Sequence, residues 1–299
     1  MINALTNIRN SFRKGSIPIQ IIYINVAVFL IIAFIHLMVI LFNRSIAEFL
    51  LLLELPASFM QLLRQPWSII TYMFMHAGIL HLLFNMLWLY WFGTIFLYSY
   101  SSKHLRGLYI LGGICGGLLY MISYHIFPYF AGALYTSYLI GASASVLAIV
   151  AATAYREPNF PVRLFLFGVI RLKYIALFVI ITDLLFITSA NVGGHIAHLG
   201  GALGGLAFAA GLNKGTDLTA WINKPLDWIL SLFNKKTWKR KHKPNMKVHY
   251  NRRSKDYDFN ARKKTQSDEV DRILDKLKKS GYDNLSSEEK KTLFDASKK

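Results

Sequence analysis

The chain has 299 residues, of which 54% are hydrophobic and only 17% are charged. A soluble globular domain carries more charge than this, so the composition argues against an ordinary soluble enzyme and indicates a membrane protein. The charge is also segregated, because residues 1–213 hold only 11 of the 34 Lys and Arg residues. The single cysteine, Cys115, excludes an intramolecular disulfide.

Six apolar segments follow one another in the first two thirds of the chain. They lie at about residues 18–42, 80–100, 105–127, 139–155, 172–189 and 195–213. The last three are near the lower length limit for crossing a bilayer. The first is longer than the apolar part of a cleaved signal peptide, so we expect it to be retained. The sequence predicts an all-α membrane protein whose body, residues 17–213, is a bundle of six transmembrane helices.

The positions of Lys and Arg predict how these helices are oriented. Basic residues occur in the first 16 residues, between the second and third segments, between the fourth and fifth, and after the sixth. The connections at 128–138 and 190–194 contain none. Because basic connections stay in the cytoplasm, we expect residues 1–16 and the C-terminus there. The predicted location is the bacterial cytoplasmic (inner) membrane, with the chain as an integral, multi-pass protein.

Two regions do not fit the pattern of spanning helices. Residues 43–79 mix apolar residues with charges and prolines, and we expect a long first loop of short pieces in the membrane interface. Residues 214–266 are expected to form a basic cytoplasmic linker attracted to anionic lipid, with residues 234–264 disordered. Residues 267–299 are predicted to form two short helices, the second opening with a capping box of Ser286 and Glu289.

Polar side chains within the apolar segments are candidates for function, because they are costly in lipid. Ser143 and His198 reach a similar depth, counted at about 1.5 Å per residue from the cytoplasmic ends of their helices. A serine beside a histidine can act as nucleophile and base. The alternatives are a small packing residue at Ser143 and a structural hydrogen bond at His198. His195, one turn nearer the surface, is a rival base.

Glycines and a second pair of polar residues extend this set. Gly141 precedes Ser143, while Gly201 and Gly205 have the spacing that lets two helices approach closely. His81 and Asn85 share one face of the second helix and can donate hydrogen bonds to a developing oxyanion. The alternative for these residues is ordinary packing or hydrogen bonding between helices.

Asp183 is the one acidic residue within a predicted span. It could orient a histidine, as the third member of a catalytic triad does. It could equally be protonated or bonded to a hydroxyl, and we favour such a structural role. We expect no cofactor, no metal ion and no nucleic-acid partner, and the sequence identifies no partner for the tail.

The stretches "HAGILHLLFN", "GASA" and "HLGGALGG", in this order behind a long first loop, resemble the rhomboid family of intramembrane serine proteases. The resemblance covers residues 17–213. It implies a catalytic dyad of Ser143 and His198, and an oxyanion hole formed by the Ser143 N–H group, His81 and Asn85. It also implies that the base is not His195. The substrates would be transmembrane segments of other proteins, cleaved through an acyl-enzyme.

Two departures from the family pattern stand beside this resemblance. Ala144 follows the serine where glycine is usual, and the first loop has Trp67-Ser68 in place of Trp-Arg. Two other classes of function remain as alternatives. A catalytically silent rhomboid-like protein that binds membrane clients would lack the serine or the histidine. A transporter would need paired acids deep in the bundle, where only Asp183 is available.

Overall fold

The computed structural model describes residue 12 and residues 15–164, 168–189, 191–233, 265, 268–279 and 281–297. The chain divides into two compact units, residues 1–234 and residues 235–299. The stretch predicted to be disordered, residues 234–264, lies outside the described residues.

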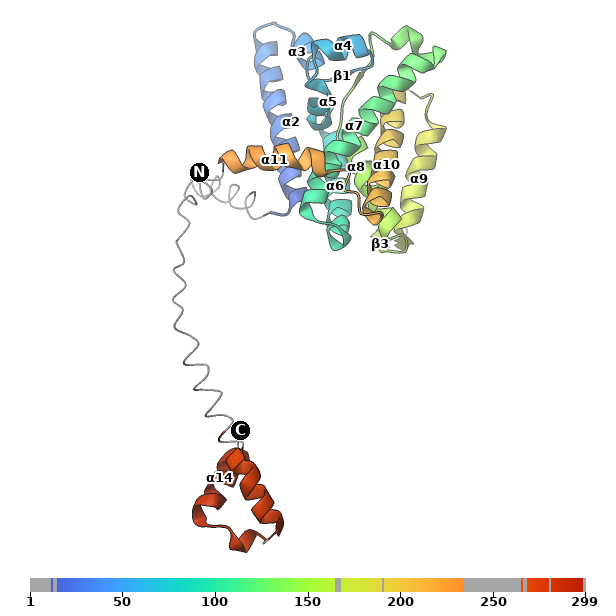
Figure 1. Cartoon of the computed structure of the whole chain (residues 1–299). Helices are drawn as coiled ribbons and strands as arrows, with labels where there is room; N and C mark the ends of the chain where they lie inside the picture. Colours follow the sequence, from blue (N-terminus) through green and yellow to red (C-terminus); the bar gives the residue numbers. More distant parts are fainter. Residues whose placement is uncertain are drawn as a thin grey trace. The chain divides into compact units, whose positions relative to one another are not determined.

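A helix occupies each of the six predicted segments (Figure 1). These helices are α2 (Ile17–Leu41), α6 (Ile79–Ser99), α7 (Ser102–Ile126), α8 (Ser143–Arg156), α9 (Leu172–Leu185) and α10 (Val192–Asn213). Helices α2, α6, α7 and α10 are long and apolar enough to cross a membrane. Helices α8 and α9 have 14 residues each, fewer than an average bilayer requires. The fold is that of a mostly helical, multi-pass membrane protein, and six crossings stay a prediction.

Helix α8 is the centre of the bundle, and 11 of its 14 residues are buried. An apolar helix that is buried on all sides needs small side chains where its neighbours come closest. A methyl group added at Gly201 or Gly205 of α10 would collide with the backbone of Ala144 or Ala148. The close helix approach that the glycine spacing predicts is therefore present between α8 and α10.

Helix α7 packs against the same part of α8 and accounts for one departure from the family pattern. A methyl group added at Gly116 would lie 2.6 Å from the Ala144 side chain, which is too close for two carbon atoms. The space that Gly116 leaves open therefore accommodates the extra methyl of Ala144. Gly112, one turn earlier, faces Ala148 in the same way.

The first loop is broken into short pieces, as its composition predicts. They are α3 (Ala47–Leu51), β1 (Leu55–Pro56), α4 (Phe59–Arg64), α5 (Ser68–Thr71) and η1 (Tyr72–Phe74). Strand β1 pairs antiparallel with β2 (Tyr138–Leu139), directly before α8. A second antiparallel pair joins β3 (Pro161–Leu164) to β4 (Gly168–Arg171). The all-α prediction missed both pairs, because strands of two to four residues leave no periodic pattern.

The loop is held without the arginine that the family pattern has at position 68. Gln65 Nε2 donates hydrogen bonds to the carbonyls of Leu51 (2.9 Å) and Glu54 (3.0 Å). Trp67 Nε1 donates to the carbonyl of Leu52 at 2.7 Å. Three carbonyls at the end of α3 are thereby bonded to side chains, and the loop folds back on itself. Ser68 is buried, and its hydroxyl has no partner among the described residues.

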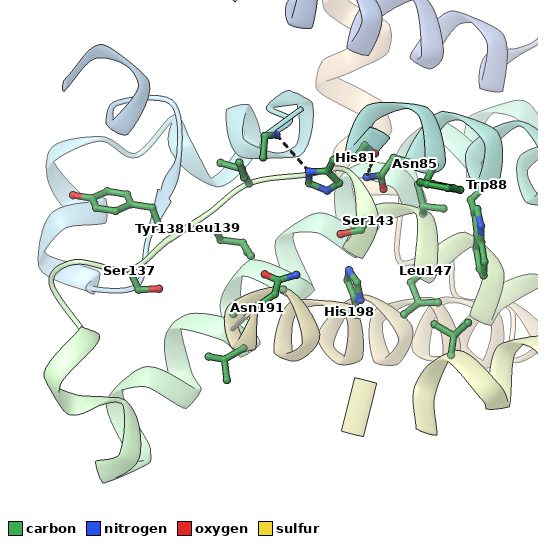
Figure 2. Close-up of a pocket in the computed structure, with 18 of the residues that line it drawn as sticks. His81, Asn85, Trp88, Ser137, Tyr138, Leu139, Ser143, Leu147, Asn191 and His198 are labelled. Carbon is green, nitrogen blue, oxygen red and sulfur yellow. Dashed lines mark hydrogen bonds between the residues drawn. The ribbon is translucent and has the colours of Figure 1, made fainter. Parts of the chain in front are cut away.

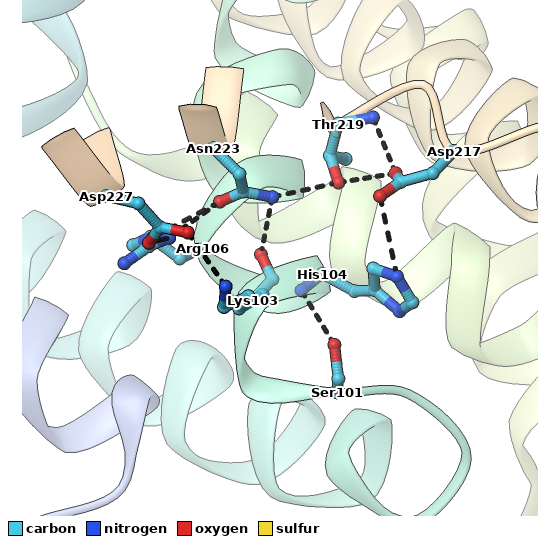
Figure 3. Close-up of polar contacts among 8 residues, drawn as sticks. All are labelled: Ser101, Lys103, His104, Arg106, Asp217, Thr219, Asn223 and Asp227. Carbon is cyan, nitrogen blue, oxygen red and sulfur yellow. Dashed lines mark hydrogen bonds and ion pairs between the residues drawn. The ribbon is translucent and has the colours of Figure 1, made fainter. Parts of the chain in front are cut away.

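The structure differs from the expected linker boundary at residue 214. Helix α11 (Ala220–Phe233) runs across the bundle rather than along it (Figure 1). Its Asp227 accepts hydrogen bonds from Lys103 (2.8 Å) and Arg106 (2.6 Å) at the start of α7 (Figure 3). These bonds lower the pKa of Asp227. The body thus continues through α11. The sequence did not predict this helix, because Pro225 lies in its interior and basic residues surround it.

The second unit is small, and its described part includes a helical stretch at residues 268–279. Gly281, with φ of 77°, ends that stretch and leads through η4 (Tyr282–Asn284) into α14 (Ser287–Ser297). The Ser286 N–H donates to Glu289 Oε2 at 2.8 Å, and the Glu289 N–H donates to Ser286 Oγ at 3.3 Å. These reciprocal bonds are the predicted capping box.

A single methyl group tests the contact between α8 and α10. Gly201→Ala places its methyl against the backbone of Ala144, which cannot move aside as a flexible side chain would. We expect the variant to lose about 1–3 kcal/mol of stability and to unfold at a lower temperature in detergent. The control is Gly132→Ala, because nothing lies within 4 Å of the methyl that it adds. Equal melting temperatures for the two variants would contradict the packing described here.

Candidate active site

A cavity of about 720 Å³ lies at the N-terminal ends of α6, α8 and α10 (Figure 2). Its lining includes all four polar residues predicted for the site: His81, Asn85, Ser143 and His198. The segment 137–140, which contains β2, forms another part of the wall. Residues distant in the sequence are therefore brought together in one cavity.

Ser143 is the first residue of α8. The first N–H groups of a helix have no partner within the helix, and they lie at the positive end of its dipole. Gly141, with φ of 123°, makes the sharp turn into α8, and its N–H donates to the Tyr72 carbonyl at 2.9 Å. A residue with a side chain rarely adopts this conformation. Gly141 thus presents Ser143 and the helix N-terminus to the cavity.

His198 is bonded to Asp183 of α9. The Nδ1 atom of His198 lies 2.9 Å from Asp183 Oδ1, and the Nδ1 atom of His195 lies 2.8 Å from the same oxygen. A hydrogen on His198 Nδ1, donated to the carboxylate, leaves Nε2 without a proton and able to accept one. Figure 2 shows a ring nitrogen of His198 directed toward Ser143. Among the described residues no hydrogen bond joins these two side chains, and such contacts are often long in unliganded enzymes.

This geometry changes the interpretation of Asp183. The sequence favoured a structural role, whereas the structure buries Asp183 (3% exposed) and bonds it to both histidines of α10. The signal in the sequence was the spacing of His195 and His198, which places both rings on one face of a helix. The sequence could not show that α9 brings its carboxylate to that face.

His81 and Asn85 lie on the opposite side of Ser143. The Ala77 N–H donates to His81 Nδ1 at 3.4 Å, so in the neutral ring the hydrogen is on Nε2. A methyl group at Gly141 would lie 3.0 Å from His81 Nε2 and 3.7 Å from Ser143 Oγ. The His81 donor and the Ser143 hydroxyl therefore flank one small space. Asn85 Nδ2 donates one hydrogen bond, to the His81 carbonyl at 2.9 Å, and has a second hydrogen to offer.

Sequence reasoning missed several residues of the wall. Ser137 precedes β2, accepts a hydrogen bond from Tyr120 (2.8 Å) and donates one to Tyr124 (3.2 Å). Asn191, which precedes α10, and Trp88 of α6 also line the cavity. No spacing within one element connects these residues, so only the tertiary fold assembles them.

Comparison with known proteins identifies two matching family models. A family model described as the Rhomboid domain matches residues 63–214, and one described as a family of unknown function (DUF6576) matches residues 253–299. The chain is 31% identical over 159 residues to a protein of Arabidopsis thaliana named "RHOMBOID-like protein 12, mitochondrial". That match covers 50% of this chain and 47% of the relative, so the chain spans about half of that protein's length.

We expect the stability of the body to depend on pH through His76, which lies in the loop before α6. Burial, and then the nearby His81, lower the pKa of His76 from 6.5 to about 4. Between these values the unfolded chain binds a proton that the folded chain does not, so stability is lost as the pH falls. We expect His76→Gln to lose less thermal stability than the wild type between pH 7 and pH 5.

The control for this measurement is His125→Gln, which alters a histidine whose Nδ1 is bonded to the Met121 carbonyl at 2.8 Å. Melting temperatures would be recorded at both pH values for the three proteins. An acid-induced loss of the same size in all three would show that His76 is not the group responsible.

Proposed function

Because this chain belongs to the rhomboid family, we propose that it is an intramembrane serine endopeptidase, a hydrolase that cleaves transmembrane segments of other membrane proteins. The observation that carries the proposal is the cavity in which Ser143, His198, His81 and Asn85 meet. They supply a nucleophile, a base and two hydrogen-bond donors, the groups that acyl transfer requires.

The reaction begins with Ser143 as nucleophile. His198 Nε2 accepts the hydroxyl proton as Oγ attacks the peptide carbonyl, and the tetrahedral intermediate collapses when His198 gives the proton to the leaving amine. Water, deprotonated by the same ring, then hydrolyses the acyl-enzyme. Asp183 touches no reacting atom. As a positioning residue, 2.9 Å from Nδ1, it holds the ring in the tautomer that leaves Nε2 free.

The oxyanion of each tetrahedral intermediate needs donors that are already in place. The Ser143 N–H lies at the N-terminus of α8, where the helix dipole favours negative charge. His81 Nε2 and Asn85 Nδ2 approach from α6. Hydrogen bonds from such fixed donors strengthen as the carbonyl oxygen becomes an anion, which lowers the barrier.

The substrate must lose its helical structure at the scissile bond, because a helix keeps its carbonyls in internal hydrogen bonds. Strand β2 lines the cavity and pairs with β1 in a sheet of two strands. Its other edge is therefore available to an extended segment. Pairing there would hold an unwound substrate close to Ser143, five residues after the start of β2.

A second candidate is a catalytically silent family member that binds membrane clients. It is favoured by the lack, among the described residues, of a hydrogen bond between Ser143 and His198. In this case the same cavity would hold an unwound client segment without cleaving it.

Substitution of the two central residues separates these candidates. Ser143→Ala and His198→Ala should lower the cleavage of reconstituted transmembrane substrates by at least about 10³-fold, because each removes a group needed for acyl transfer. Ser145→Ala is the matched control, since this neighbouring serine is buried and its hydroxyl has no partner among the described residues. Cleavage by Ser143→Ala at the rate of Ser145→Ala would contradict the proposal.

The donors on α6 are tested by kinetics. We expect His81→Ala and Asn85→Ala each to lower kcat by about 10²–10³-fold with little change in KM, because their bonds form fully only with the oxyanion. The control is Asn25→Ala, which removes a buried asparagine of α2 bonded to Tyr109. That variant should lose stability and keep its kcat. A rise in KM at unchanged kcat for His81→Ala would assign His81 to substrate binding instead.

A further inference from the structure

The acidic residue beside His198 has an incomplete set of contacts. Asp183 Oδ1 is shared by the Nδ1 atoms of His195 and His198, at 2.8 and 2.9 Å. Asp183 Oδ2 is buried and has no hydrogen-bond partner among the described residues. Leaving a buried carboxylate oxygen unpaired is costly. Hydrogen bonding by the two histidines alone therefore does not satisfy this side chain.

From this cluster we infer a binding site for a divalent transition-metal ion of the zinc class, held by His195 Nδ1, His198 Nδ1 and the Asp183 carboxylate. One ligand atom from each residue lies within 4.8 Å of the other two. Zinc takes histidine nitrogens and carboxylate oxygens at about 2.0–2.2 Å, so its ligands lie about 3.4 Å apart. The two Nδ1–Oδ1 distances, 2.8 and 2.9 Å, are already close to that spacing, and movement of the two histidine rings toward each other would bring all three atoms to it.

The chemistry of the three ligands favours some ions over others. Two imidazoles and one carboxylate suit zinc, cobalt and nickel, whereas magnesium and calcium prefer sites made wholly of oxygen atoms. The side chains of His195 and His198 are 19% and 22% exposed. His198 also lines the cavity. An ion in water can therefore reach the ligands, and a water molecule can complete its coordination.

Occupancy of this site would inhibit the protease, a consequence that rests on the function proposed above. Base catalysis needs the hydrogen of His198 on Nδ1 and a free lone pair on Nε2. A metal ion bound at Nδ1 displaces that hydrogen, and the neutral ring then carries its proton on Nε2. In that state His198 cannot accept the proton of Ser143. Removal of the ion by a chelator would restore the active tautomer.

Metal binding can be measured without any cleavage. The full-length Ser143→Ala protein in detergent would be titrated with Zn²⁺ by equilibrium dialysis, with Co²⁺ absorption as a second readout. We expect the Ser143→Ala protein to bind one Zn²⁺ ion. Adding His195→Gln or Asp183→Asn to this protein should lower its affinity for Zn²⁺ at least tenfold. Zn²⁺ should raise the melting temperature of the parent protein and not that of these variants. The control is His125→Gln, whose binding should be unchanged.

The result that overturns the inference is the absence of binding, or binding that both ligand variants retain. A separate assay measures the cleavage rate of each active protein with Zn²⁺ added. Each rate is divided by the rate of the same protein in the presence of a chelator. Inhibition of the wild type that His195→Gln relieves at least tenfold supports the inhibitory role. Binding at the cluster without inhibition refutes that role alone. A wild type that cleaves nothing counts against the protease, while the dialysis result still decides the metal site.

Discussion

The contact between α8 and α10 determines the rest of this structure. Small residues at a helix interface let two backbones approach closely, which brings a serine on one helix near a histidine on the other. Gly201 and Gly205 have no side chains and let α10 rest on the backbone of Ala144 and Ala148. Ser143 and His198 lie at the same end of this interface and line one cavity. The geometry of the site thus follows from residues that have no chemistry of their own.

The first loop and the turn before α8 complete the site. Pairing of β1 with β2 fixes the segment that leads to Gly141, and the Tyr72 carbonyl accepts the N–H of that glycine. The positive φ of Gly141 then turns the chain into α8 beside the ring of His81. The first loop thereby sets the position of the serine, and its side-chain bonds to its own backbone hold it in place.

Much of the body could be predicted because its signals are local. The length of the apolar segments predicted the helices, and the spacing of Gly201 and Gly205 predicted that α10 packs closely against another helix. The sequence left open whether Asp183 meets a histidine, since the carboxylate and the histidines belong to different helices and no pattern within either one joins them. Helix α11 was not predicted, for a different reason. Its contacts with Lys103 and Arg106 are tertiary, and a proline and a basic setting argue locally against a helix.

The identity of the nucleophile can be measured directly by covalent labelling. A fluorophosphonate probe would be added to the wild-type protein in detergent, and the modified peptide would be located by mass spectrometry. We expect one adduct, on Ser143, that disappears in His198→Ala while the variant keeps its fold. An adduct on another serine, or an unmodified wild-type protein, would contradict the assignment of Ser143 as a nucleophile activated by His198.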